Sequence, residues 1–287
     1  MENGKMKNDK ETKKLDYNNF EEAKELFLRF RDKYLHGNID ELANFSFWEI
    51  SGDSDFDGTC FEKYSPKFDG DRTRIIYAID RLIYNDKNLP NFSEPFGVNY
   101  SGETINTFNT LFSSRKNWRE TILKKFNLEE RKSIFAENAT DDFYHIYQRL
   151  GNFMLLPCKT LCHISINSYR GVHPEWKDYF YPFMTYLEKS YEVKDFNFYS
   201  DKSLYELSLL RKENDFFFAE NSFNNFMELF DLQNFNSLEL RKYLKRTELF
   251  ESAENREIAL DYVKKAKEFI KKRTEVLLDK LKVNLNK

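Results

Sequence analysis

A stretch near the C-terminus constrains the fold most, because apolar residues recur in it at three- and four-residue steps from about Ser252 to Leu281. This spacing predicts one long amphipathic helix. Its apolar stripe comprises Ala259, Tyr262, Val263, Ala266, Phe269, Ile270, Leu277 and Leu281. This stripe must be buried, either against the chain's own core or against a second subunit.

Arg273 interrupts the stripe. Its long side chain either carries the charge outward or pairs with an acid on a partner. We therefore expect Phe269, Ile270 and Arg273 to bind a partner, or to form a homo-oligomer contact through the C-terminal helix.

The same helical spacing occurs earlier in the chain, where it predicts helices over 20–36 and 75–83. Shorter helices are expected at 104–112, 118–126, 141–150 and 174–191. Between residues 49 and 70 the pattern breaks into Gly, Asp, Ser and Pro, which indicates short strands or an ordered acidic loop. The predicted fold class is mainly α with minor β, a multi-helix globular body with a long C-terminal helix.

Three parts are expected along the chain. Residues 1–14 are Lys-rich without an apolar core, which predicts a flexible arm rather than a signal peptide. Residues 15–235 are expected to form the main helical domain, with the acidic loop at 49–70, and residues 236–287 a C-terminal helical segment. Because the chain has 29 Phe and 17 Tyr, aromatic side chains must fill much of the interior.

The charge balance disfavours several classes of partner. The net charge is −3, from 45 Lys and Arg against 48 Asp and Glu, so no overall field attracts nucleic acid or an anionic membrane. No run of about 18 apolar residues occurs, so a membrane span is not expected. Three cysteines without a secretion signal favour reduced thiols and a cytoplasmic location.

The sharpest local motif lies in the acidic loop. Asp53, Asp55 and Asp57, followed by Gly58, match the opening of a calcium-binding loop, in which alternating carboxylates converge on the cation. The motif is incomplete, because Tyr64 stands where the bidentate Glu is required. A solvated acidic turn is therefore the favoured interpretation, and a metal site at these three aspartates is the alternative.

No other motif predicts a cofactor or a known catalytic class. Cys158, Cys162, His163 and His173 are zinc-ligand types, but their spacing does not match structural zinc sites, so buried thiols are favoured and no cofactor is expected. P-loop, G-x-G-x-x-G, H-E-x-x-H, G-x-S-x-G and kinase signatures are missing. Scattered carboxylates can still form a metal-dependent site, so enzyme status stays open, with a non-enzymatic protein favoured.

Four segments together resemble a bacterial or mobile-element protein family of unknown function over about residues 50–235. They are Asp57 with Tyr64-Ser65-Pro66, Gly151 to Pro157, Ser165 to Gly171, and Phe223 to Leu232. The resemblance implies one structural unit, whose most recognisable feature contains Asn167 and Arg170. These two are candidate binding residues, because both donate hydrogen bonds and Arg suits a carboxylate or phosphate. A structural Arg paired with an Asp is the favoured explanation.

These features favour a non-enzymatic protein-interaction module. Its most specific form is a phage- or mobile-element-encoded inhibitor that binds and blocks a bacterial anti-phage defence complex in the host cytoplasm. The support is the lack of a complete catalytic motif, the many aromatic residues, the unclassified family and an AT-rich coding style. The alternative is a metal-dependent hydrolase or nuclease that uses Asp53, Asp55 and Asp57 with Arg170 or His173. Direct nucleic-acid binding is disfavoured by the negative net charge.

Overall fold

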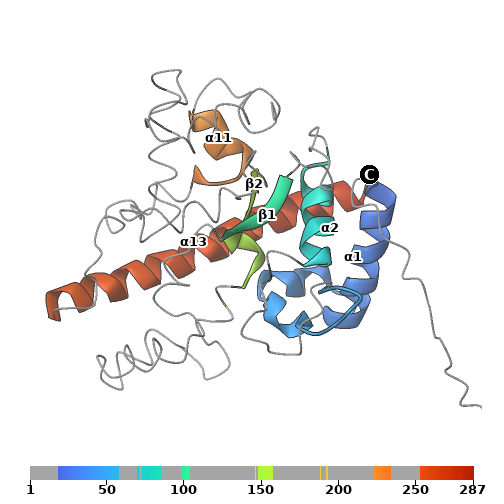
Figure 1. Ribbon diagram of the computed structural model, residues 1–287, viewed down its shortest axis with the longest axis horizontal. Coiled ribbons are helices and arrows are strands. Elements are labelled where there is room, and N and C mark those ends of the chain that lie inside the picture. The colour runs from blue at the N-terminus through green and yellow to red at the C-terminus, as the bar shows by residue number, and fades with distance from the viewer. Residues whose placement is uncertain are drawn as a thin grey trace, which may run out of the picture.

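The computed structural model describes residues 19–57, 70, 73–85, 98–103, 146, 148–157, 188, 192, 223–233 and 253–287. Within these ranges the fold is mainly α with a minor β component, as the sequence predicts. The elements (Figure 1) are α1 (Phe20–Tyr34), η1 (Ile39–Ala43), η2 (Phe47–Ile50), α2 (Arg74–Ile83), β1 (Val98–Glu103), η4 (Leu150–Asn152), β2 (Phe153–Pro157), α11 (Phe223–Leu229) and α13 (Ala253–Leu285). The helices expected between 104 and 191 lie almost entirely outside the described residues.

The first helix, α1, begins and ends at residues whose chemistry suits a helix terminus. The Asn19 side chain accepts a hydrogen bond from the Glu21 backbone N–H at 2.9 Å, which satisfies a donor of the first turn. At the other end His36 and Gly37 have positive φ, and the Gly37 N–H donates to the Arg31 carbonyl at 3.1 Å. This turn ends the helix slightly before the predicted position 36.

Aromatic rings join α1 to the segment that follows it. The ring centroid of Phe30 lies 5.2 Å from that of Phe45, 6.0 Å from Phe47 and 5.7 Å from Phe56. Phe47 in turn lies 5.7 Å from Phe153, the first residue of β2. Each such ring pair contributes roughly 0.5–1.5 kcal/mol beyond the burial of its area. Part of the phenylalanine content therefore fills this core, as its abundance predicts.

The acidic loop connects to α2 through the backbone. The Arg74 N–H donates to the Asp57 carbonyl at 3.2 Å, and the Ile75 N–H donates to the Phe56 carbonyl at 3.1 Å. Residues 51–57 form consecutive turns, so this part of the predicted segment is an ordered loop rather than a strand. The helix itself is interior, because its apolar residues are buried: Ile75, Ile76, Ala78, Ile79, Leu82 and Ile83.

β1 and β2 form one antiparallel pair. Val98 lies opposite Pro157 and Tyr100 opposite Leu155, with an irregularity in register between Tyr100 and Glu103. β2 follows directly from η4, so the chain is extended immediately after a tight turn. This geometry presents the Gly151 carbonyl of η4 and the Phe153 carbonyl of β2 to the long helix.

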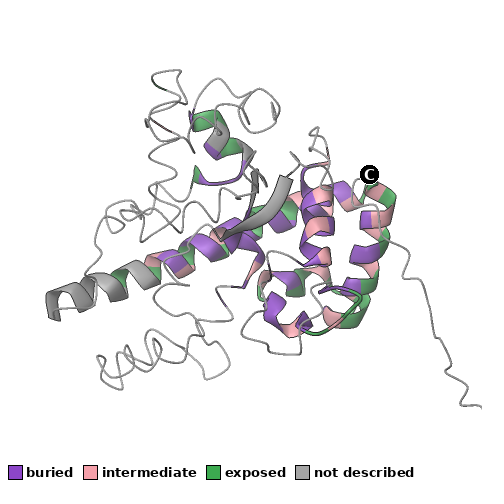
Figure 2. Cartoon of the chain, viewed as in Figure 1, coloured by how far each residue is buried: buried purple, intermediate pink, exposed green. Residues whose placement is uncertain are grey.

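α13 is the longest element that the structure describes. Its 33 residues correspond to about 50 Å of helix. Figure 1 shows its N-terminal turns extending beyond the other labelled elements, whereas its C-terminal half contacts η4, α2 and η1. In Figure 2 this half is largely buried on one side. None of the helices in the described part of the chain combines the length and the hydropathy needed to cross a bilayer.

Candidate functional site

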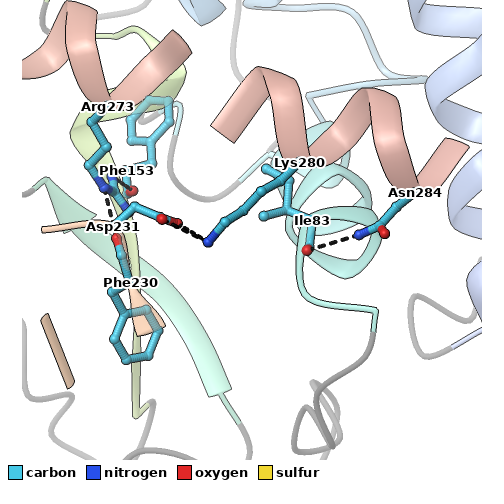
Figure 3. Close-up of polar contacts among 7 residues, drawn as sticks. All are labelled: Ile83, Phe153, Phe230, Asp231, Arg273, Lys280 and Asn284. Atoms are coloured by element: carbon cyan, nitrogen blue, oxygen red, sulfur yellow. Dashed lines mark hydrogen bonds and ion pairs between the residues drawn. The ribbon is translucent and has the colours of Figure 1, made fainter. Parts of the chain in front are cut away.

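The largest buried charge that the structure describes is Arg273, in the C-terminal half of α13, with 1% of the residue exposed. Its Nε–H donates to the Phe230 carbonyl at 3.0 Å, and Nη1 donates to the Gly151 carbonyl at 2.8 Å and to the Phe153 carbonyl. Figure 3 shows the side chain reaching Phe153 and Phe230. A buried guanidinium is costly unless its donors are satisfied. Arg273 therefore fastens η4, β2 and the end of α11 to one helix.

Gly151 allows the close approach that this arrangement needs. Its N–H donates to the Thr274 hydroxyl at 3.0 Å, and that hydroxyl donates to the Ile270 carbonyl at 2.7 Å. A Cβ atom at position 151 would lie 2.5 Å from Thr274 Oγ1 and 2.7 Å from Thr274 N, and would collide with the Ile270 carbonyl. Only glycine lets the η4 backbone lie this close to α13.

An ion pair holds the turn after α11. Lys280 Nζ lies 2.7 Å and 2.6 Å from the two carboxylate oxygens of Asp231 (Figure 3). Asp231 has a φ of 56°, a left-handed conformation that Asp tolerates better than most residues. Because the Asp231 side chain is 8% exposed, the pair is less screened than a surface salt bridge. It fixes the position of the Phe230 carbonyl that Arg273 binds.

Asn284 closes the end of α2. Its side-chain amide donates to the Leu82 carbonyl at 2.8 Å. It also donates to the Ile83 carbonyl at 3.1 Å, as Figure 3 shows. The last carbonyls of a helix have no partner within that helix, so a side-chain donor stabilises them. α2 is thereby attached to α13 by polar as well as apolar contacts.

Two further titratable groups are buried at this junction. Asp80 of α2 is 5% exposed, and its Oδ2 has no hydrogen-bond partner. Burial raises the pKa of Asp80 to about 8, although the positive charge of Arg273 acts in the opposite direction. Burial also raises the pKa of Tyr84 above its ordinary range, and Arg273 again opposes the shift. We call Asp80, Tyr84, Asp231, Arg273 and Lys280 the junction cluster.

Comparison with known protein families assigns the chain. Residues 57–277 match the model of a family described as "Family of unknown function (DUF6994)". The chain belongs to DUF6994. Comparison with curated proteins and with solved structures gave no match.

The DUF6994 match extends into α13, beyond the 50–235 range over which the four segments resemble a family. It includes Asp80, Gly151, Phe230, Asp231 and Arg273. The family region therefore holds most of the contacts that join η4, β2 and α11 to the long helix. Lys280 and Asn284 lie beyond the matched residues.

The three residues that we expected to contact a partner are instead buried within this chain. Phe269 and Ile270 are 0% and 1% exposed, and the Arg273 guanidinium is occupied by backbone carbonyls. The apolar stripe is thus covered by the chain's own core, so the expectation of docking through these side chains is corrected. The physical reason is that η4, α2 and η1 pack against α13 and supply the surface that the stripe requires.

The aspartates of the calcium-like motif do not converge. Asp53 Oδ2 accepts from Lys33 Nζ at 2.7 Å and from the Tyr34 hydroxyl, while Oδ1 accepts from the Asp55 N–H at 3.1 Å. Asp57 is buried, and its Oδ2 accepts from the Gly52 N–H at 2.9 Å. Among the described residues, no group of three or more His, Cys, Asp and Glu could hold a metal ion. Asp53 and Asp57 stabilise the loop through these hydrogen bonds, and Asp57 is buried rather than solvated.

Several sequence candidates lie outside the described residues. These are Asn167 and Arg170, together with Cys158, Cys162, His163 and His173. Sequence reasoning found Arg273 through its position within an apolar stripe, but it missed Asp80. Asp80 carries a comparable signal, since it lies between Ile79 and Leu82 in a helix that is otherwise apolar on its buried sides.

Proposed function

We propose that this chain is a non-enzymatic protein-interaction module, and in its most specific form an inhibitor, encoded by a phage or mobile element, that binds and blocks a bacterial anti-phage defence complex. Its site of action would be the host cytoplasm. One observation carries the proposal: α13 is anchored on one side and presents two valines on the other. Val276 is 37% exposed and Val283 is 58% exposed.

The two valines lie on one face of the helix. Residues seven apart on an α-helix are related by about two turns, so their side chains share a face. The opposite side of the same turns contains Leu277, Leu281 and Asn284, which are buried. Anchoring of that side lowers the entropy lost when the exposed side binds a partner.

The charges around the valines favour a protein partner over a polyanion. The exposed charged residues of this helix are of both signs and include Lys264, Glu268, Lys271, Glu275 and Asp279. Nucleic acid binding requires clustered positive charge, whereas a mixed strip can complement both signs on a protein surface. This supports a folded protein as the partner.

The buried polar groups have structural tasks, which is consistent with a scaffold. Arg273 binds three backbone carbonyls, and Asp53 and Asp57 hold the acidic loop. Arg273 was a candidate for partner binding, and Asp53 and Asp57 are two of the three aspartates of the candidate metal site. In this proposal they make the helix rigid rather than act on a substrate.

The experiment compares phage growth on bacteria that carry one defined defence complex, with and without a tagged copy of this chain. We expect the chain to restore plaque formation and to co-purify with the complex. The variant Val276→Ser with Val283→Ser should lose roughly tenfold or more in affinity, because each buried valine contributes about 1.5 kcal/mol or more. Both valines are exposed, so the variant should remain folded.

The matched control is Lys264→Ser with Lys271→Ser, which makes the same replacement at exposed positions of the same helix. It should keep both plaque restoration and co-purification. Failure to restore plaques on a panel of defence complexes contradicts the inhibitor proposal. If light scattering shows that the valine variant only reduces the mass of a homo-oligomer, a second copy of this chain is the occupant instead.

A further inference from the structure

An orphan carboxylate oxygen lies between α2 and α13. Asp80 is on the buried side of α2, and its Oδ2 has no hydrogen-bond partner. Buried polar atoms are nearly always partnered, and an exception of this kind calls for a physical reason. A protonated carboxyl tolerates such a site far better than a carboxylate, because burial penalises the charged form.

The positive charge of Arg273 acts on Asp80, but the donors of its guanidinium already bind other acceptors. Its Nε–H and Nη1 donate to the carbonyls of Phe230, Gly151 and Phe153. Asp80 therefore receives the field of the guanidinium while these donors remain directed at the backbone. The field alone does not supply the hydrogen bond that Oδ2 lacks.

The other titratable groups of the junction cluster interact with one another or with Arg273. Lys280 of α13 is paired with Asp231, which follows α11. Tyr84 follows α2 and is itself influenced by Arg273, Asp231 and Asp80. Gly151 and Asn152 of η4 carry no titratable group. Within the junction cluster, Asp80 is the residue with a buried side-chain oxygen that lacks a hydrogen-bond partner.

We propose that Asp80 is a proton-operated latch between α2 and α13, which holds the two helices together when its carboxyl is protonated and loosens them when the proton is lost. The latch is independent of the proposed function. Its pKa, raised to about 8 by burial against the opposing effect of Arg273, places the change near neutral pH. Loosening would separate α13 from the end of α2, where Asn284 binds the carbonyls of Leu82 and Ile83.

The direction of the pH effect follows from proton linkage. The ordinary pKa of the Asp side chain is 3.8, and the folded value is about 8. Between these values the folded chain binds a proton that the unfolded chain releases. Stability from this group is therefore fully present below about pH 4, falls as pH rises toward 8, and changes little beyond that.

The first experiment measures urea unfolding of the wild type, Asp80→Asn and Asp279→Asn from pH 5 to pH 9. Asn keeps the shape of the neutral carboxyl and cannot ionise. Relative to Asp80→Asn, the unfolding equilibrium constant of the wild type should rise by up to about tenfold per pH unit between pH 5 and 8. Asp279 is exposed on α13, so Asp279→Asn is the matched control and should follow the wild type.

Hydrogen exchange at a single pH locates the effect. At pH 8.5 the α13 segment around Arg273 should exchange faster in the wild type than in Asp80→Asn, and at pH 5.5 this difference should be much smaller. If Asp80→Asn is less stable than the wild type at pH 8.5, Asp80 is an ionised partner of Arg273 and the latch is wrong. Parallel pH profiles for the two proteins contradict it as well.

A measurement on the wild type covers the case in which Asp80→Asn does not fold. Carbon-13 labelling of the Asp carboxyl carbons allows each to be titrated by NMR in the native chain. One carboxyl should titrate near pH 8, well above the others. If all the Asp carboxyls titrate in their ordinary range, the latch is ruled out.

Discussion

Arg273 brings a permanent positive charge into the interior and gives its donors to carbonyls of three segments. The guanidinium is planar and presents several N–H groups at fixed angles, so one side chain can serve acceptors in different directions. A lysine at this position would keep the charge but lose that geometry. The residue therefore determines which backbone segments can meet at α13, and Gly151 determines how closely one of them approaches.

The first prediction concerns this close approach. Gly151→Ala should destabilise the protein by about 2–3 kcal/mol or more, because its Cβ would overlap Thr274 and the Ile270 carbonyl, which are backbone or tightly held atoms. Gly37→Ala is the comparison, since a Cβ there has open space and only the positive φ of 78° opposes it. That change should cost about 1 kcal/mol. Equal midpoints in urea unfolding would show that η4 does not lie against α13.

At the scale of elements, α13 combines two kinds of attachment. Apolar side chains along one side are buried, and polar contacts from Arg273 to Asn284 fix its register against η4, α2 and the turn after α11. Apolar burial is non-directional and alone permits sliding of a helix by one turn. The hydrogen bonds are directional, so they select one position.

The second prediction tests whether the buried stripe belongs to the core of this chain. Phe269→Asp with Ile270→Asp places two carboxylates at positions that are almost fully buried, at a cost of several kcal/mol. The double variant should unfold, as circular dichroism would show. Lys264→Asp with Lys271→Asp changes exposed positions of the same helix and should remain folded. A double variant that stays folded but falls to a lower mass in light scattering would return these side chains to an interface.

For the whole molecule, two buried or half-buried carboxyls respond to pH in opposite directions. Asp80 favours the protonated form, as described above. Burial also acts to raise the pKa of Asp53, but hydrogen bonds from Lys33, Tyr34 and the Asp55 N–H outweigh it, so the pKa is lowered. Asp53 thus stabilises the fold above the ordinary Asp pKa of about 4, and this stability is lost as pH falls through its lower folded pKa.

The third prediction follows from that contrast. Asp53→Asn should lower stability at pH 6 by about 1 kcal/mol and flatten the loss of stability below pH 4, because the ion pair to Lys33 and the hydrogen bond from Tyr34 are weakened. Urea unfolding between pH 2 and 6 is the measurement. Asp55→Asn, at an exposed position of the same loop, should leave the acid limb unchanged. If stability falls just as steeply between pH 6 and 2 in Asp53→Asn as in the wild type, other carboxyls cause the loss of stability in acid.

Periodicity was enough to predict α13, α2 and most of α1, because a helix with one buried side repeats its apolar residues regardless of what covers them. The incomplete calcium motif predicted a solvated acidic turn, since Tyr64 cannot replace a bidentate Glu, whereas the structure buries Asp57. Only part of the candidate site could be predicted from the sequence. Arg273 can be found because it interrupts the apolar stripe in the sequence. Its acceptors are backbone carbonyls, and because every residue has one, residue type does not identify them.

The sequence by itself therefore determined the fold class, the long helix and the side of it that must be covered. Only the tertiary structure decided that η4, α2 and η1 cover that side, which moved Phe269, Ile270 and Arg273 from an expected interface into the core. The spacing of apolar residues shows which of them share one face of a helix. It does not record which distant segment occupies that face, because that depends on contacts between residues more than a hundred positions apart, such as Gly151 and Thr274.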